Sequence, residues 1–191
     1  MEKGSQVGKK SFIFNFFLTP TDKSANKKTP ATARQVALAA VLTALAVVLG
    51  SLSIPVGATK VAPSQHMINA IAGVLLGPWY AVLMAFITAT IRIGLGVGTI
   101  FAYPGSVFGG LVVGIVYKYI KKTDYAVLLE PLGTVVIGAT LSAWVFAPYI
   151  GSSLTISFFW IAFGASCIPG AILGFLILKV IRRSGFDKYF V

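Results

Sequence analysis

The sequence predicts an all-α integral membrane protein with six transmembrane helices and both termini in the cytoplasm. The chain is 57% hydrophobic, only 11% of its residues are charged, and its mean hydropathy is +0.87. Soluble domains carry charges on about a quarter of their residues. At 191 residues, the chain also has the length of a single domain. These values predict a multi-pass protein of the cell membrane, with the lipid bilayer as its surroundings.

The N-terminal part is polar and basic, with seven of the 16 basic residues in the first 34 positions. Its insert FIFNFFL is too short to cross a bilayer, which takes about 20 apolar residues. No small-residue cleavage site follows, so the insert is not a signal peptide. We interpret residues 1–33 as a disordered or membrane-surface cytoplasmic tail. Residues 34–183 then form the membrane domain, and 184–191 form a second cytoplasmic tail.

The first span is the uncharged run from Val36 to Ile54, and two prolines and a glycine predict a loop from there to His66. The next uncharged run, 67–91, fits either one long span or two short spans separated by a turn at GPWY (77–80). The basic residues decide between the two, because Lys and Arg collect on the cytoplasmic side.

Two short spans place all the basic residues except Lys60 and Arg92 on the cytoplasmic side, whereas one long span places Lys118, Lys121 and Lys122 outside. We therefore predict two spans in this region. The six predicted spans are 34–54, 67–77, 79–95, 104–121, 129–148 and 157–181.

The acidic residues are few, and the sequence predicts that all five lie on or near the cytoplasmic side, with none in the middle of a span. Ion-coupled transporters commonly place a carboxylate near the midplane, and the predicted spans of this chain have none there. The chain contains no HExxH motif and no P-loop. Its single cysteine, Cys167, excludes an internal disulfide and a multi-cysteine metal site. We therefore predict no enzyme activity, no cofactor and no metal. The positive charge follows the ends of the spans, which also argues against a nucleic-acid partner.

Small residues recur at four-residue spacing, which places them on one face of a helix and lets two helix backbones approach closely. Ala40 and Ala44 do so in the first span, where docking on a partner membrane protein and internal packing are both open interpretations. For the glycines we favour packing inside the bundle. The glycine pairs are Gly105–Gly109, Gly110–Gly114 and Gly170–Gly174.

Polar residues from three parts of the sequence gather at the predicted outer ends of the spans. Singly, each has an ordinary explanation: His66 caps a helix, Lys60 is solvated, and Arg92 reaches the headgroups. Together they indicate an outward-facing binding pocket, because ionisable groups near a membrane commonly mark a site. Trp144, Trp160 and Tyr149 are candidates for its apolar walls. The candidate polar residues are Lys60, Gln65, His66, Asn69, Arg92, Thr99 and Tyr103.

Three motifs in this region resemble the ThiW family of substrate-binding S components of energy-coupling factor (ECF) transporters. They are P-x-G-x-x-K-V-x-P-x-Q-H (55–66), N-A-I-A-G-V-L-L-G-P-W-Y (69–80) and G-T-I-F-A-Y-P-G-S-x-F-G (98–109). The family more often has Leu at Ile100 or Phe at Tyr103. The resemblance covers 34–183 and is specific in the first four spans. The long N-terminal tail departs from it.

The resemblance implies a six-helix subunit that captures a small molecule outside the cell. It also implies partners, namely a membrane scaffold subunit, which would contact Ala40 and Ala44, and two cytoplasmic ATPases. The expected substrate is a thiamine precursor, the thiazole moiety hydroxyethylthiazole. Three alternatives remain. They are an S component for another vitamin-like or anionic molecule, a stand-alone facilitator built on the glycine pairs, and a membrane enzyme or lipid-modifying protein with His66 as its base.

Overall fold

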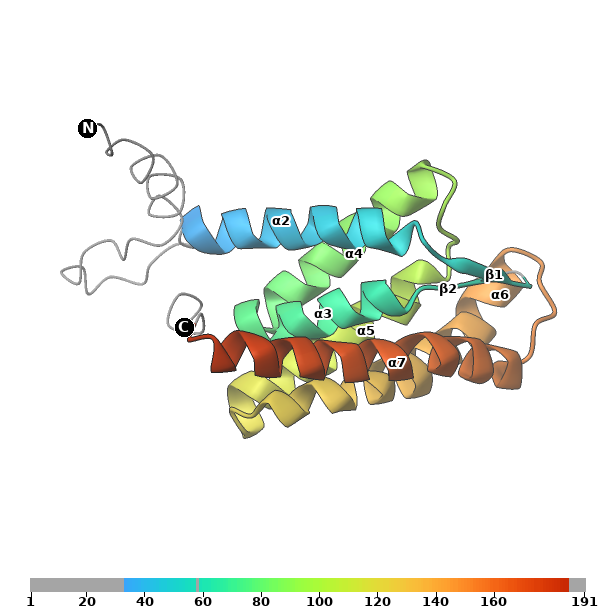
Figure 1. Cartoon of the computed structure of the whole chain (residues 1–191). Coiled ribbons are helices and arrows are strands. Elements are labelled where there is room, and N and C mark those ends of the chain that lie inside the picture. The colour runs from blue at the N-terminus through green and yellow to red at the C-terminus, as the bar shows by residue number, and fades with distance from the viewer. Residues whose placement is uncertain (1–32, 58, 186–191) are drawn as a thin grey trace, which may run out of the picture. The chain divides into compact units, whose positions relative to one another are not determined.

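The computed structural model describes residues 33–57 and 59–185, so most of both predicted tails lies outside the described residues. The chain divides into two compact units, Met1–Ala37 and Leu38–Val191, and the second unit holds a bundle of helices (Figure 1). Six helical segments follow one another along the described chain, as predicted. The first three are α2 (Ala33–Gly50), α3 (Pro63–Leu76) and α4 (Pro78–Gly94). The fourth is α5 (Ala102–Ile115), which the π-helical turn η1 (Val116–Ile120) continues. The fifth is irregular and consists of η2 (Asp124–Leu129), η3 (Leu132–Ala139), η4 (Ser142–Phe146) and α6 (Ala147–Tyr149), and the sixth is α7 (Ile156–Arg183).

Three of these segments are long and apolar enough to cross a membrane: Ala33–Gly50, Asp124–Tyr149 and Ile156–Arg183. Pro78–Gly94 is a shorter apolar helix. The central helix α3 has 14 residues and packs against α4, α5 and α7. Because its neighbours shield it, α3 does not need the length of a lipid-exposed span.

Two short helices rather than one long span occupy the region 67–91, as the distribution of basic residues predicts. Gly77 separates them with φ 86°, a backbone conformation that glycine adopts readily. Pro78 then occupies the first turn of α4, where its missing N–H leaves no hydrogen bond unmade. The GPWY motif is therefore a tight turn between α3 and α4.

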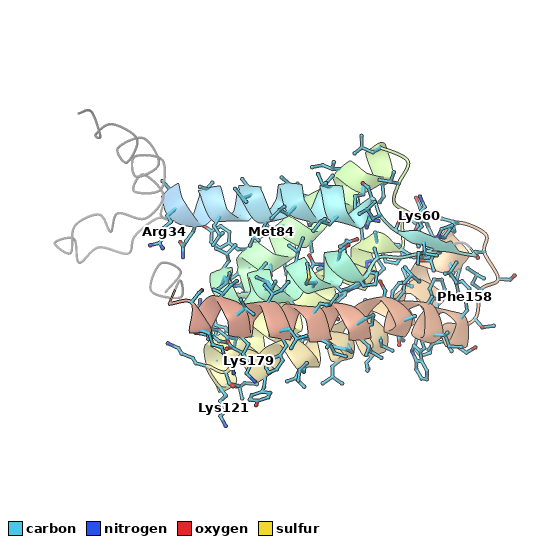
Figure 2. All side chains as sticks on the ribbon, viewed as in Figure 1. Arg34, Lys60, Met84, Lys121, Phe158 and Lys179 are labelled. Atoms are coloured by element: carbon cyan, nitrogen blue, oxygen red, sulfur yellow. The ribbon has the colours of Figure 1, made fainter. Side chains whose placement is uncertain are left out.

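The segment predicted as a loop before α3 contains a short antiparallel hairpin, which the sequence analysis did not anticipate. Strand β1 (Ile54–Val56) pairs with β2 (Thr59–Val61), with Pro55 opposite Lys60. Gly57 follows β1 with φ 56°, a left-handed conformation that glycine adopts readily and that a tight turn requires. The hairpin lies at one end of the bundle, where Lys60 is found, whereas Lys121 and Lys179 lie at the opposite end (Figure 2).

The glycine pairs face the interior of the bundle and allow close contact between helices. A Cβ atom on Gly114 would lie 2.5 Å from Cα of Pro78, and one on Gly170 would lie 2.8 Å from Cβ of His66. Both distances are shorter than a non-bonded contact allows. The structure therefore places these pairs where the packing interpretation expects them, and Gly170 lets the first turn of α3 lie directly against α7.

Candidate functional site

A cavity lies at the hairpin end of the bundle, with a volume of about 390 Å³ that includes space open to solvent. No acidic side chain lines it among the described residues. The lining residues come from β2, the first turn of α3, the end of α4, the loop after α4, the start of α5 and the middle of α7: Thr59, Lys60, Ala62, Gln65, His66, Arg92, Gly98, Thr99, Phe101, Ala102, Gly105, Ser106, Phe163 and Ser166.

Five of the predicted polar residues, Lys60, Gln65, His66, Arg92 and Thr99, line this one cavity. The bundle brings them together because the first turn of α3 and the last turn of α4 lie at the same end. A short turn links these two antiparallel helices, so residues 27 positions apart in the sequence form a hydrogen bond.

Both cations at the cavity are already bound to protein acceptors. The Arg92 guanidinium donates to the side-chain oxygen of Gln65, to the carbonyl of Gly50 at 2.6 Å and to that of Val97 at 3.4 Å. Lys60 Nζ donates to the carbonyl of Gly96 at 3.1 Å. Arg92 is 2% exposed, so it does not reach the headgroups as a snorkelling arginine would. These carbonyl and amide oxygens offset much of the positive charge.

Below the cavity, His66 meets a carboxylate that the sequence analysis placed wrongly. His66 Nδ1 lies 2.7 Å from Oε1 of Glu130, and the Glu130 side chain is 0% exposed. Cys167, near the middle of α7, has its thiol facing the same carboxyl. The sequence placed Glu130 near the cytoplasmic ends of the spans. The fifth helix begins at Asp124, however, so Glu130 lies more than one turn inside the bundle.

Four predicted site residues do not line the cavity. Asn69 is buried one turn further along α3, and its Nδ2 lies 3.5 Å from the carbonyl of Ser106. The Tyr103 hydroxyl lies 3.0 Å from Thr90 Oγ1, and its ring packs on Phe86. Trp144 and Trp160 are 72% and 48% exposed on the outside of the bundle. A helix period alone does not tell a lipid-facing indole from a core-facing one.

The apolar wall is instead made by two phenylalanines that the sequence analysis did not select. Phe101 and Phe163 both line the cavity and are 1% and 6% exposed. Phe159 packs behind them, with ring centroids 4.7 Å from Phe101 and 5.8 Å from Phe163. The motif around GTIFAYPG contained one signal, since Phe101 lies two residues after Thr99, a predicted site residue. Ser166 also lines the cavity and accepts the N–H of Ala62 at 2.8 Å.

Helix α2 presents Ala40 and Ala44 on its exposed face. Leu42 and Ala46 are buried on the opposite face. Of the three described helices long and apolar enough to cross a membrane, α2 is the least buried inside the bundle. Its small-residue face is therefore open to lipid or to another membrane protein.

The fold and the cavity define a class of protein, a small helical membrane protein with a pocket of polar and aromatic residues at one end of its bundle. The bundle resembles the crystal structure of the S-component for biotin from an ECF-type ABC transporter. The two share a TM-score of 0.57 and 23% sequence identity, covering 86% of this chain and 100% of that one. At this identity the likeness shows the fold alone.

The chain belongs to the ThiW family, described as thiamine-precursor transporter proteins, whose family model matches residues 36–184. No curated protein matches the chain significantly. The family consists of membrane transporters, which confirms the expectations of a membrane location and of a protein that is not an enzyme. The resemblance predicted from the three motifs is likewise confirmed.

Proposed function

We propose that this chain is the substrate-binding S component of an ECF importer and that it captures the thiazole moiety of thiamine, hydroxyethylthiazole. The observation that carries the proposal is the cavity, which combines phenylalanine walls with polar groups and has no acidic lining residue among the described residues. A thiazole alcohol offers a flat ring, one ring nitrogen and one hydroxyl. It therefore requires an aromatic wall and a few hydrogen bonds, but no counter-charge.

The charge of the ligand follows from the partners of the two cations. Lys60 and Arg92 donate to carbonyl and amide oxygens of the protein. A neutral ligand leaves these bonds in place, whereas an anion would compete for them. We therefore favour the neutral alcohol over a phosphorylated or carboxylated substrate. The site residues in this proposal are Lys60, Gln65, His66, Arg92 and Thr99, with Phe101 and Phe163 as walls.

Mass spectrometry of ligand co-purified with the detergent-solubilised protein tests the substrate directly. We expect the neutral thiazole alcohol, because a nanomolar complex, at about −12 kcal/mol, survives purification. In calorimetric titrations the phosphorylated alcohol should bind no more tightly than the neutral one. The Lys60→Ala variant should show the same ratio of affinities for the two compounds as the wild type. Tighter binding of the phosphate, with loss of that preference in Lys60→Ala, would identify an anionic substrate.

The proposed orientation places the hairpin end outside and both chain termini in the cytoplasm. Lys121 and Lys179, together with Arg182 and Arg183, belong to the opposite end, as the positive-inside rule requires. Capture from outside then matches a cavity at the hairpin end. Energy would come from two cytoplasmic ATPases coupled through a membrane scaffold subunit.

Single cysteines in a Cys167→Ser background measure this orientation. Tyr149 and Lys121 are both exposed and lie on the two predicted sides of the membrane, so they form a matched pair. In intact cells, Tyr149→Cys should react with an impermeant maleimide, whereas Lys121→Cys should react only after permeabilisation. The reverse pattern would show that the cavity faces the cytoplasm and would contradict capture from outside.

A second candidate function follows from the buried Glu130, since a carboxylate within the bundle is a feature of proton-coupled transporters. A proton-coupled transporter that works alone would accumulate thiazole in vesicles containing only this chain when a pH gradient is applied. An S component should bind the substrate in those vesicles but accumulate it only with the scaffold, the ATPases and ATP. Accumulation of thiazole by the chain alone would support the proton-coupled transporter and contradict the S component.

A further inference from the structure

Glu130 is the buried acid of the bundle that the proposed binding role does not use. It lies between η2 and η3, and its side chain is 0% exposed. Oε1 lies 2.7 Å from His66 Nδ1 and 2.7 Å from Thr134 Oγ1. The absent side chain of Gly109 makes room for the carboxyl, because a Cβ there would collide with Oε1. The carboxyl is thus held in a site built from three helices.

His66 joins this carboxyl to the cavity. Its Nδ1 is bound to Glu130, while the residue itself lines the cavity and 9% of its side chain stays accessible. Within residues 33–57 and 59–185, Nε2 has no hydrogen-bond partner and is not among the polar atoms sealed from solvent. Nε2 is therefore the imidazole atom that remains for a ligand.

Charge neutrality of the buried His66–Glu130 pair decides whether Nε2 carries a hydrogen. A single proton shared between Nδ1 and Oε1 gives either an imidazolium with a carboxylate or a neutral imidazole with a carboxylic acid. Both forms are neutral overall, and both keep the hydrogen on Nε2. Two other states leave Nε2 bare. A carboxylate beside a neutral imidazole buries an uncompensated negative charge within the bundle, which is strongly unfavourable. A carboxylic acid with its proton on Oε2 buries an O–H donor without an acceptor, because Oε2 has no hydrogen-bond partner among the described residues.

The other ionisable groups around the pair do not replace this balance. Arg92 and Lys60 line the same cavity, but their donors are directed at Gln65 and at backbone carbonyls. Cys167, buried on α7 with its Sγ 3.9 Å from the Gly164 carbonyl, contributes no positive charge. Among the described residues, neither cation forms a hydrogen bond or ion pair with Glu130.

We infer that Glu130 is a positioning residue that makes His66 a hydrogen-bond donor to the ligand, so that the site selects for an acceptor atom such as an azole nitrogen. The azole part rests on the proposed function. The donor part does not, since it follows from the His66–Glu130 geometry. A ligand with an unprotonated ring nitrogen would match this donor.

The donor state can be measured without any ligand, because His66 is the only histidine of the chain. Protein labelled with ¹⁵N-histidine and purified free of ligand gives one pair of imidazole signals. At pH 7 we expect Nε2 to show the chemical shift of a protonated nitrogen. An unprotonated Nε2 with a protonated Nδ1 would overturn the inference, whatever the protein transports.

Glu130→Gln tests the role of the carboxyl. The amide can either accept from Nδ1–H or donate to Nδ1, so a bare Nε2 should become populated in the variant. Thr134→Val is the matched control, because it removes the other contact to Oε1 and leaves His66–Glu130 intact. An unchanged Nε2 signal in folded Glu130→Gln would contradict the positioning role. If that variant does not fold, the wild-type spectrum still decides.

Ligand discrimination gives the second readout. We compare the thiazole alcohol with its thiophene analogue, which lacks the ring nitrogen. Wild-type protein and Thr134→Val should favour the thiazole by about tenfold, the contribution of one ordinary hydrogen bond. Glu130→Gln should lose most of this preference. Equal preference in Glu130→Gln and wild type would overturn the azole part, while failure of both compounds to bind wild type would count against the proposed substrate and leave the spectrum as the test.

Discussion

Replacing Arg92 with alanine is expected to destabilise the folded protein by at least about 3 kcal/mol, because each buried polar group left unpaired costs roughly 1–3 kcal/mol. One guanidinium holds three parts of the bundle together: the end of α2 through the Gly50 carbonyl, the first turn of α3 through Gln65, and the loop after α4 through Val97. Truncation leaves these acceptors in a buried site without donors. The hairpin end of the bundle should therefore loosen first.

Thermal unfolding in detergent, followed with a thiol-reactive dye, measures this effect. The only thiol of the chain, Cys167, is buried and becomes reactive when the bundle opens. Arg182→Ala is the matched control. Arg182 pairs with Asp124 at 2.6 Å, but its side chain is 32% exposed, and such pairs contribute about 0–1 kcal/mol. Similar unfolding temperatures for Arg92→Ala and wild type would show that Arg92 does not hold the fold together.

The sequence predicts the helices well because length, hydropathy and charge act locally along the chain. The division of 67–91 into α3 and α4 follows from the positions of Lys and Arg and from the turn at Gly77. The hairpin escaped prediction for the opposite reason. Strands of three residues give almost no period-2 signal, and Pro55 argues against a strand unless it lies on an edge.

The polar part of the candidate site was largely predictable, and the apolar part was not. Lys60, Gln65, His66 and Arg92 stand out because polar residues are rare in this chain. Their position at the ends of spans or in the loop before α3 already suggests a shared location. The phenylalanine walls belong to a composition with 14 phenylalanines. Which of them face the cavity depends on helix rotation, which tertiary packing sets.

The position of Glu130 shows where charge-based reasoning fails. Glu130 follows the Lys118–Lys122 cluster closely in the sequence, which suggested a location near the cytoplasm. The rule that acids avoid the membrane interior supported this location. The rule holds for unpaired acids. Glu130 is accommodated because His66 at the start of α3 and Thr134, one turn after Glu130 on its own helix, contact its carboxyl. Gly109 on α5 leaves the space that the carboxyl occupies.

The largest functional effect is expected from bulky residues at Ala40 and Ala44. Both are exposed on α2, four residues apart, while Leu42 and Ala46 pack against the bundle from the opposite face. The face of α2 that would contact a partner is therefore different from the face that packs against the bundle. Tryptophan at both positions should hold a partner helix away and abolish complex formation with the scaffold subunit, because close backbone approach requires small side chains. Ligand binding should remain close to wild type, since neither residue lines the cavity.

Co-purification of the tagged variant with the scaffold and ATPases, together with calorimetric ligand binding by the isolated chain, measures both effects. Ala165→Trp is the matched control, because Ala165 is an exposed alanine on α7 and the same substitution there changes a different surface. The control should form the complex normally. Normal complex formation by Ala40→Trp/Ala44→Trp would remove α2 as the docking helix. Loss of ligand binding along with the complex would mean that the substitutions disturb the bundle, so that the small-residue face serves packing rather than coupling.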